Sequence, residues 1–163
     1  MRQELVALIP RLRRFARVLT GNLADADDVV QASLEKAMVN LDQWQSGTRL
    51  DSWLFTIARN TWIDDRRRAS NRMVHDDVAE LADLAGEDGV MLAEQQATVR
   101  EVRAAVDQLG PEQREIVALV MLEEYSYREA AQALNLPIGT VMSRLSRAKA
   151  ALGRIMVHQG ESE

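Results

Sequence analysis

Hydroxyl and guanidinium side chains recur along residues 140–149, beside an apolar stripe with helical spacing. The stripe consists of residues at intervals of four, three and four positions: Val141, Leu145, Ala148 and Leu152. The candidate binding residues beside it are Thr140, Ser143, Arg144 and Arg147. Such groups hydrogen-bond to base edges and phosphates. A helix that begins near Thr140 and exposes them therefore has the chemistry to read a DNA major groove.

A shorter predicted helix and a tight turn precede this segment. Residues 127–134 carry Ala130, Ala131 and Leu134 on one face. Pro137 and Gly139 then interrupt the helical pattern. Two short helices joined in this way form a helix-turn-helix, which can place its second helix in the major groove. The same shape also occurs as an ordinary helical hairpin with a solvated basic face, so this stretch alone leaves both interpretations open.

A second group of candidate binding residues surrounds a helix predicted over residues 50–68. It combines aromatic, cationic and amide side chains: Arg59, Asn60, Trp62 and Arg66. Aromatic rings beside cations can stack on unpaired bases. The alternative is that the tryptophans are core residues. The apolar stripe of this helix is Trp53, Leu54, Ile57, Ala58 and Thr61. The stripe favours a core position for Trp53, whereas Trp62 lies largely on the other side and either interpretation stands.

Carboxylates cluster at the start of a helix predicted over residues 25–41. Asp25, Asp27 and Asp28 could suggest metal ligands, but acids at a helix N-terminus commonly cap free N–H groups, so we expect no metal site. The predicted buried stripe of this helix is Val30, Leu34, Ala37, Met38 and Leu41. Outside it we expect an exposed Val29. Together with Asp28, Gln31 and Glu35 it would form a mixed face suited to a protein partner.

Other kinds of chemistry find little support in the sequence. Without cysteine, disulfides, thiolate metal sites and a cysteine nucleophile are excluded. His75 and His158 lie far apart in polar segments and there is no Gly-rich phosphate loop, so we expect no enzyme, no cofactor and no small-molecule substrate. The longest apolar run, residues 116–122, is far shorter than the ~20 residues of a membrane helix. Arginines interrupt any signal-peptide-like run near the N-terminus, and we expect a soluble cytoplasmic protein.

The helical patterns predict an all-α protein of two small helical domains, and only eight of 163 residues are Gly and three are Pro. Helices over residues 4–19, 25–41 and 50–68 would form a domain of residues 1–68. Pro10 would start or kink the first helix, and Gly21 would cap it. A flexible acidic linker is predicted over residues 69–92, because residues 75–99 hold seven acids and no Lys or Arg. Residues 93–157 would form a four-helix domain, followed by a polar tail over residues 158–163. The first stripe of that domain is Val99, Val102, Val106 and Leu109.

Taken together, these segments resemble the ECF sigma factors, the minimal two-domain class of bacterial RNA polymerase sigma subunits. Residues 25–31 (DADDVVQ) resemble the family's DAEDLVQ segment, and residues 53–60 (WLFTIARN) resemble its W-L-x-x-I-A-R-N segment. Residues 109–115, 125–131 and 137–148 resemble its region 4. Each segment alone is weak evidence for the family. Their occurrence together, in this order along the chain, is specific to it. Residues 8–21 and 53–61 also resemble sigma factors of the general stress response in alphaproteobacteria.

The resemblance implies a promoter-specificity subunit that acts with core RNA polymerase and is held inactive by an anti-sigma factor. In region 2, the helix with Asp28, Gln31 and Glu35 would bind polymerase. Trp44 and Asn60 would form a pocket for a flipped base of the −10 element, and Arg59, Trp62 and Arg66 would flank it. In region 4, the residues beside the apolar stripe would enter the −35 major groove, with Lys149 nearer the backbone. This last set is Thr140, Ser143, Arg144, Arg147 and Lys149.

One departure from the family pattern concerns the pocket. Where the family often has Phe-Arg-Gly, residues 44–47 read Trp-Gln-Ser-Gly, which removes a cation beside the flipped base. Two alternatives accompany the sigma-factor interpretation. A stand-alone helix-turn-helix regulator would have no use for the WLFTIARN helix. A sigma mimic that sequesters an anti-sigma factor would have no use for the basic face at Arg144 and Arg147.

Overall fold

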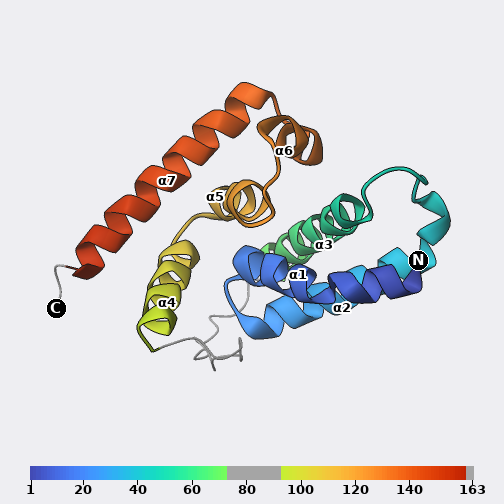
Figure 1. Cartoon of the computed structure of the whole chain (residues 1–163), viewed down its shortest axis with the longest axis horizontal. Helices are drawn as coiled ribbons and strands as arrows, with labels where there is room; N and C mark the ends of the chain where they lie inside the picture. Colours follow the sequence, from blue (N-terminus) through green and yellow to red (C-terminus); the bar gives the residue numbers. More distant parts are fainter. Residues whose placement is uncertain (73–92, 161–163) are drawn as a thin grey trace. The chain divides into compact units, whose positions relative to one another are not determined.

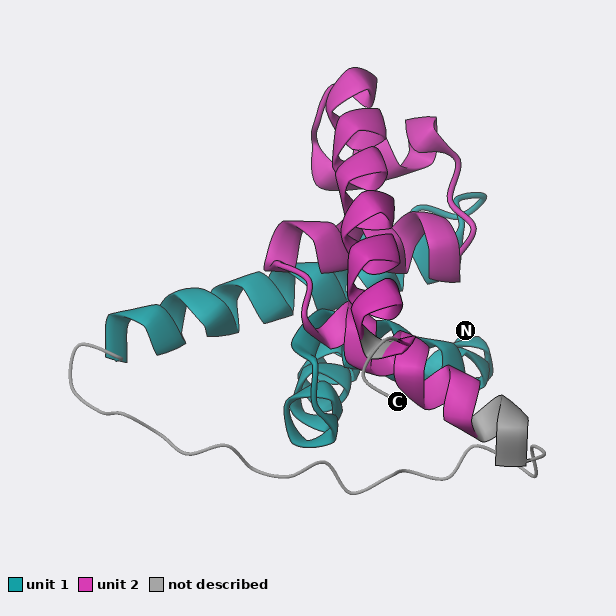
Figure 2. Cartoon of the chain, turned by 90° about the vertical axis from the view of Figure 1, so that its left-hand side faces the viewer, with its two compact units in different colours: residues 1–85 teal, residues 86–163 magenta. Residues whose placement is uncertain are grey.

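The computed structural model describes residues 1–72 and 93–160, and all the regular structure in these ranges is helical. The chain divides into two compact units, residues 1–85 and 86–163 (Figure 2). The all-α prediction is confirmed. Of the predicted linker, residues 73–92 lie outside the described residues, whereas residues 69–72 belong to the third helix.

Three helices that pack against one another build the first unit (Figure 1). They are α1 (Arg2–Thr20), α2 (Leu23–Val39) and α3 (Leu50–Arg72), with a 3₁₀ turn, η1 (Leu41–Gln43), after α2. In their core the rings of Phe15 and Phe55 stack with centroids 4.8 Å apart. Gly21 ends α1 in the left-handed conformation (φ 82°), as predicted, and its N–H donates to the Arg17 carbonyl.

Helix α1 begins at Arg2, so the prediction that Pro10 might start it is wrong. Proline in a helix removes the hydrogen bond to the carbonyl four residues earlier, here that of Val6. Val6 and Pro10 are both exposed, so water can reach the side of the helix that carries this carbonyl. The same side faces away from the core, where the proline ring is tolerated. Helix α1 therefore continues through Pro10.

The buried side of α2 differs from the prediction. Val29 is buried, with 2% of its surface exposed, whereas Met38 is 51% exposed. The buried residues are Ala26, Val29, Val30, Ser33 and Ala37. The cause is Ser33, whose hydroxyl donates to the Val29 carbonyl and is thereby satisfied inside the core. The sequence prediction treats this serine as polar and therefore places the buried stripe through Leu34 and Met38.

The buried side of α3 agrees with the prediction at Leu54, Ala58 and Thr61, but Phe55 and Trp62 are buried in place of Trp53 and Ile57. Its buried residues are Leu54, Phe55, Ala58, Thr61 and Trp62. The buried Thr61 hydroxyl donates to the Ile57 carbonyl at 2.8 Å and accepts from Lys36 Nζ at 3.0 Å, so α2 and α3 share a polar bridge. Trp62 is only 5% exposed, and the alternative of an exposed Trp62 is wrong. Trp53 is half-buried, so the core position expected for it is reached only in part.

The second unit is organised around one long helix, α7 (Ile138–Gly160), against which α4 (Ala93–Asp107), α5 (Pro111–Ile116) and α6 (Tyr127–Leu134) pack. Pro111 lies at the start of α5, as predicted. A π-helix, η2 (Val117–Leu122), continues α5 and was not predicted. Helix α7 extends to Gly160, so the predicted polar tail is helical up to that residue.

The predicted stripe of α7 is buried except for Leu152, which is half-buried, whereas the predicted stripe that begins in α4 is buried only toward its C-terminal end. Val141, Leu145 and Ala148 lie in the core. Val106 and Leu109 are buried too, whereas Val99 and Val102 are exposed, so that part of the predicted stripe is wrong. Periodicity identifies a stripe that could be buried. Burial also requires a partner, and within the described residues none covers these two valines.

Candidate nucleic-acid interface

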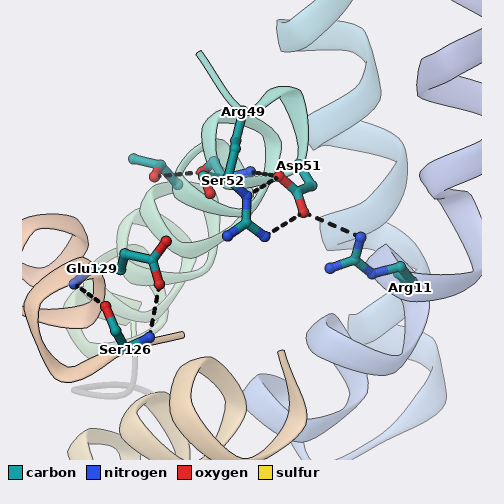
Figure 3. Close-up of polar contacts among 7 residues, drawn as sticks. Arg11, Arg49, Asp51, Ser52, Ser126 and Glu129 are labelled. Carbon is teal, nitrogen blue, oxygen red and sulfur yellow. Dashed lines mark hydrogen bonds and ion pairs between the residues drawn. The ribbon is translucent and has the colours of Figure 1, made fainter. Parts of the chain in front are cut away.

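A capping box fixes the start of α6, the first helix of the helix-turn-helix (Figure 3). The Ser126 hydroxyl accepts from the Glu129 backbone N–H at 3.1 Å, and the Glu129 carboxylate accepts from the Ser126 backbone N–H at 2.7 Å. Asn135 ends α6 in the left-handed conformation (φ 52°). The Leu136 N–H then donates to the Ala131 carbonyl at 3.0 Å. These contacts turn the chain tightly into α7, which begins two residues earlier than predicted, at Ile138.

Four of the five candidate residues of the second helix lie outside the core along α7. Ser143, Arg147 and Lys149 are exposed, and Thr140 is partly exposed. Arg147 folds back along the helix, where its Nε donates to the Ser143 carbonyl at 3.3 Å and its second guanidinium nitrogen lies 3.4 Å from the Ser143 hydroxyl. A hydroxyl and a guanidinium are therefore held together on the surface, in the arrangement that base-edge and phosphate recognition needs.

The fifth residue, Arg144, lies between two helices. Its guanidinium is 3.6 Å from the carboxylate of Glu112 in the first turn of α5. Glu112 is largely exposed, so the ion pair is accessible to solvent and contributes at most about 1 kcal/mol. The pair nevertheless restrains Arg144 and neutralises part of its charge. Sequence reasoning missed Glu112 because a pair 32 positions apart leaves no periodic signal.

The second candidate group gathers on α3, except for Trp44, which lies in the loop before it. Asn60 is exposed, and the Arg59 guanidinium donates to its side-chain oxygen at 3.5 Å. The Arg66 guanidinium lies 5.0 Å from the centre of the Trp62 ring, a cation–π distance. Trp62 is therefore a buried support for an exposed cation. It is not itself a free stacking surface.

Trp44 is half-buried, and its indole N–H is enclosed without a hydrogen-bond partner among the described residues. An enclosed indole N–H normally finds an acceptor. The loop that carries Trp44 is short and polar, and its Gly47 adopts a positive φ of 94°. The ring is thus held beside the start of α3 and has an unused donor.

An ion cluster that sequence reasoning missed fixes this end of α3 (Figure 3). The Asp51 carboxylate accepts from Arg11 of α1 at 3.2 Å and from Arg49 at 2.9 Å and 3.2 Å. It also accepts from the Ser52 backbone N–H at 2.8 Å. Burial alone would raise the pKa of Asp51, but these hydrogen bonds and the two arginine charges together hold that pKa below its usual value.

Arg11 joins this ion cluster to the core of the first unit, and Arg49 joins it to the loop that carries Trp44. Its guanidinium also lies 5.3 Å from the centre of the Phe55 ring, so Arg11 contacts both the core and Asp51. Arg49 ends the loop of Trp44, and its bond to Asp51 ties that loop to α1 and α3. Arg11 and Asp51 are 40 positions apart, and no local pattern could have paired them.

The predicted protein-binding residues of α2 are exposed along one side of the helix. Asp28, Gln31 and Glu35 follow at intervals of three and four, and the Gln31 amide donates to Glu35 at 3.2 Å. At the start of α2, Asp25 joins the cap: its N–H donates to the Asn22 side chain at 2.8 Å, and its carboxylate accepts from the Asn22 amide at 2.7 Å. The N-cap of α2 is thus Asn22, and the Asp25 carboxylate holds the Asn22 side chain in place.

The described residues hold neither a cluster of metal ligands nor a helix suited to a membrane. In these parts of the chain no group of three or more His, Cys, Asp or Glu side chains could hold a metal ion. Within the same ranges no helix has the length and apolar character that crossing a bilayer requires.

Comparison with known proteins places both units in one family. Residues 99–152 match the family model for region 4 of sigma-70, and residues 5–59 match that for the Sigma2 domain of PhyR. The ECF RNA polymerase sigma factor EcfG of Rhodopseudomonas palustris (strain TIE-1) is 35% identical over 163 residues, covering 100% of this chain and 88% of EcfG. SigW of Bacillus subtilis (strain 168), also an ECF sigma factor, is 29% identical over 148 residues, covering 82% and 76% of the two chains.

Solved structures agree with the family models. The sigma factor RpoE from Bartonella quintana, in complex with the anti-sigma factor NepR, is 30% identical with a TM-score of 0.81, and the match covers 95% of each chain. CnrH, in complex with the cytosolic domain of CnrY, is 25% identical with a TM-score of 0.66, and the match covers 96% of this chain and 86% of CnrH.

The chain therefore belongs to the ECF RNA polymerase sigma factors. It is an alternative sigma subunit that works with core RNA polymerase on promoter DNA, as the sequence motifs predicted.

Proposed function

We propose that this sigma factor divides promoter recognition between its two units. In the second unit, α7 would enter the −35 major groove with Ser143 and Arg147 toward base edges and Lys149 toward the backbone. Thr140 and Arg144 would complete the contact. The observation that carries this proposal is the Ser143–Arg147 pair, a hydroxyl and a guanidinium presented together on an exposed helix face.

The first unit would hold the melted −10 strand. Asn60 would hydrogen-bond to the edge of a flipped base beside Trp44, whose enclosed N–H has no partner among the described residues. Arg59 and Arg66 would contact the strand backbone. Trp62 would act indirectly, because its ring supports Arg66 from below. Here the geometry changes the role expected for Trp62, from base contact to support.

Core polymerase would bind the exposed side of α2 that carries Asp28, Gln31 and Glu35. The acidic segment of residues 75–99 would assist by occupying a basic channel of polymerase. Most of that segment lies outside the described residues, so this role rests on charge alone. Replacing its acids by Asn and Gln should weaken holoenzyme assembly, and unchanged affinity for core polymerase would contradict this role.

We further propose that an anti-sigma protein holds the chain inactive. RpoE of Bartonella quintana was solved in complex with the anti-sigma factor NepR, and CnrH in complex with the cytosolic domain of CnrY. The protein would act in the cytoplasm, where polymerase and promoters are, and would catalyse no reaction of its own. Pull-down with a NepR-like protein, in competition with core polymerase, tests this part. Simultaneous binding of both would count against it.

A transcription assay tests the proposed function as a whole. Core polymerase, this protein and a promoter library should yield specific run-off transcripts that neither protein yields alone. The absence of transcripts together with tight binding to duplex DNA by the protein alone would instead indicate a stand-alone regulator. If the protein yields no transcripts and does not bind duplex DNA, but does bind an anti-sigma factor, it would be a sigma mimic that sequesters that factor.

A further inference from the structure

Two large apolar side chains are exposed on the part of α7 that begins the recognition helix. Ile138 is 49% exposed and Met142 is 51% exposed. They lie four positions apart on successive turns of α7, Ile138 on the same side as the buried Val141 and Leu145 and Met142 at the edge of that side. The contacts proposed above use only hydroxyl groups and cations, so they leave this apolar pair without a role.

Polar and cationic residues follow the pair along the same helix. Ser143 is exposed next to Met142, and Arg147 and Lys149 are exposed on the following turns. This charge complements the phosphates of DNA. In a helix-turn-helix the N-terminal residues of the recognition helix contact base edges, and the pair occupies positions one and five of α7.

Only one group in the major groove offers an apolar contact, the C5-methyl group of thymine. We propose that Ile138 and Met142 contact thymine methyl groups and thereby select A·T pairs within the −35 element. This inference rests on the proposed function, in which α7 reads that element. To the proposed function it adds the identity of the base, thymine, that the apolar part of α7 recognises.

A protein partner fits the pair less well. A specific protein interface covers about 800 Å² on each partner, which two side chains among hydroxyls and cations cannot supply. A thymine methyl, in contrast, is small enough for one exposed side chain to cover.

The experiment replaces thymine by deoxyuridine, which lacks only the C5-methyl group and keeps every hydrogen-bonding group. A −35 element is first selected from a promoter library with the holoenzyme. Each of its thymines on either strand is then replaced in turn, and holoenzyme affinity is measured by competition. We expect a loss of about fourfold at one or two positions, the value of one buried methyl group.

Variants of the protein then assign the contact. Met142→Ala and Ile138→Ala should bind thymine DNA about fourfold more weakly and should no longer distinguish thymine from deoxyuridine at one position each. Met156→Ala is the matched control, since Met156 is also exposed (39%) on α7 but lies near its other end. Met156→Ala should distinguish thymine DNA from deoxyuridine DNA as well as the unaltered protein does.

Several results would overturn the proposal. A selected −35 element without an A·T pair, deoxyuridine DNA bound as tightly as thymine DNA, or full discrimination by both variants would each contradict it. All three presuppose sequence-specific −35 binding. If the holoenzyme shows no −35 preference at all, the proposed function itself fails and the thymine contact fails with it.

Discussion

Arg144 of α7 and Glu112 of α5 form an ion pair 3.6 Å long, which joins a proposed DNA-reading residue to a carboxylate of the same unit. A phosphate or a guanine edge must compete with Glu112 for this guanidinium. If Arg144 contacts DNA as proposed, the pair would lower the affinity for DNA in general while it keeps Arg144 oriented. It would then link the packing of α5 to −35 recognition.

Replacing Glu112 by Gln should release Arg144. We expect −35 duplex binding to become a few-fold tighter at low salt, with a difference that shrinks as salt rises, because the removed interaction is electrostatic. The cost in unfolding free energy should stay below about 1 kcal/mol. Fluorescence anisotropy over a salt series measures the first effect. Glu124→Gln, which alters another exposed acid of the same unit, is the control.

The Asp51 cluster predicts a pH dependence of stability. Because the pKa of Asp51 is lowered in the folded protein, its ion pairs stabilise the first unit above the unfolded value of ~3.9. That contribution disappears as the pH falls through the lower folded value. Asp51→Asn should reduce stability at neutral pH by roughly 1 kcal/mol or less, and the difference between the two proteins should shrink as the pH falls below the unfolded value. Urea titrations at several pH values would refute this if the difference stayed constant.

The capping box of α6 should contribute measurably to the stability of the second unit. Ser126→Ala removes the acceptor for the Glu129 N–H and should cost about 1 kcal/mol, within a range of 0.5–2. Ser146→Ala, at an exposed position inside α7, provides the control and should cost little. An equal effect of the two substitutions on thermal unfolding would mean that the cap does not stabilise α6.

The two tryptophans of α3 should differ in their contribution to stability. Trp62→Ala removes a buried ring and should cost about 3–5 kcal/mol, whereas Trp53→Ala, at a half-buried position, should cost less. Denaturant unfolding of the full chain gives both values. Trp62→Phe, which keeps an aromatic ring over the same site, should recover part of the loss. A Trp53→Ala cost as large as that of Trp62→Ala would contradict the burial difference.

Local signals predicted the helices well because their ends have local causes. Helix α6 runs over Tyr127–Leu134, the predicted range, since Ser126 begins it and Asn135 ends it. The stripe of α7 was also correct, because Val141, Leu145 and Ala148 are apolar without exception.

The errors arose where polar groups are satisfied in ways that a pattern cannot reveal. Ser33 is buried because its hydroxyl donates to the Val29 carbonyl of its own helix, and treating it as polar rotated the predicted stripe of α2. In the candidate sites, the Arg11–Asp51 and Glu112–Arg144 contacts join distant segments. Only the folded chain brings these residues together.

The central claim is that two separate surfaces recognise two separate promoter elements, and one paired measurement tests it. Holoenzymes with Arg144→Ala and with Asn60→Ala are compared on a matrix of −35 and −10 sequence variants. Arg144→Ala should lose about 1–3 kcal/mol in −35 recognition and keep its −10 preference. Asn60→Ala should change the −10 base preference and leave −35 duplex affinity unchanged. If both substitutions shift the same promoter positions in the same way, the division of recognition between the units is wrong.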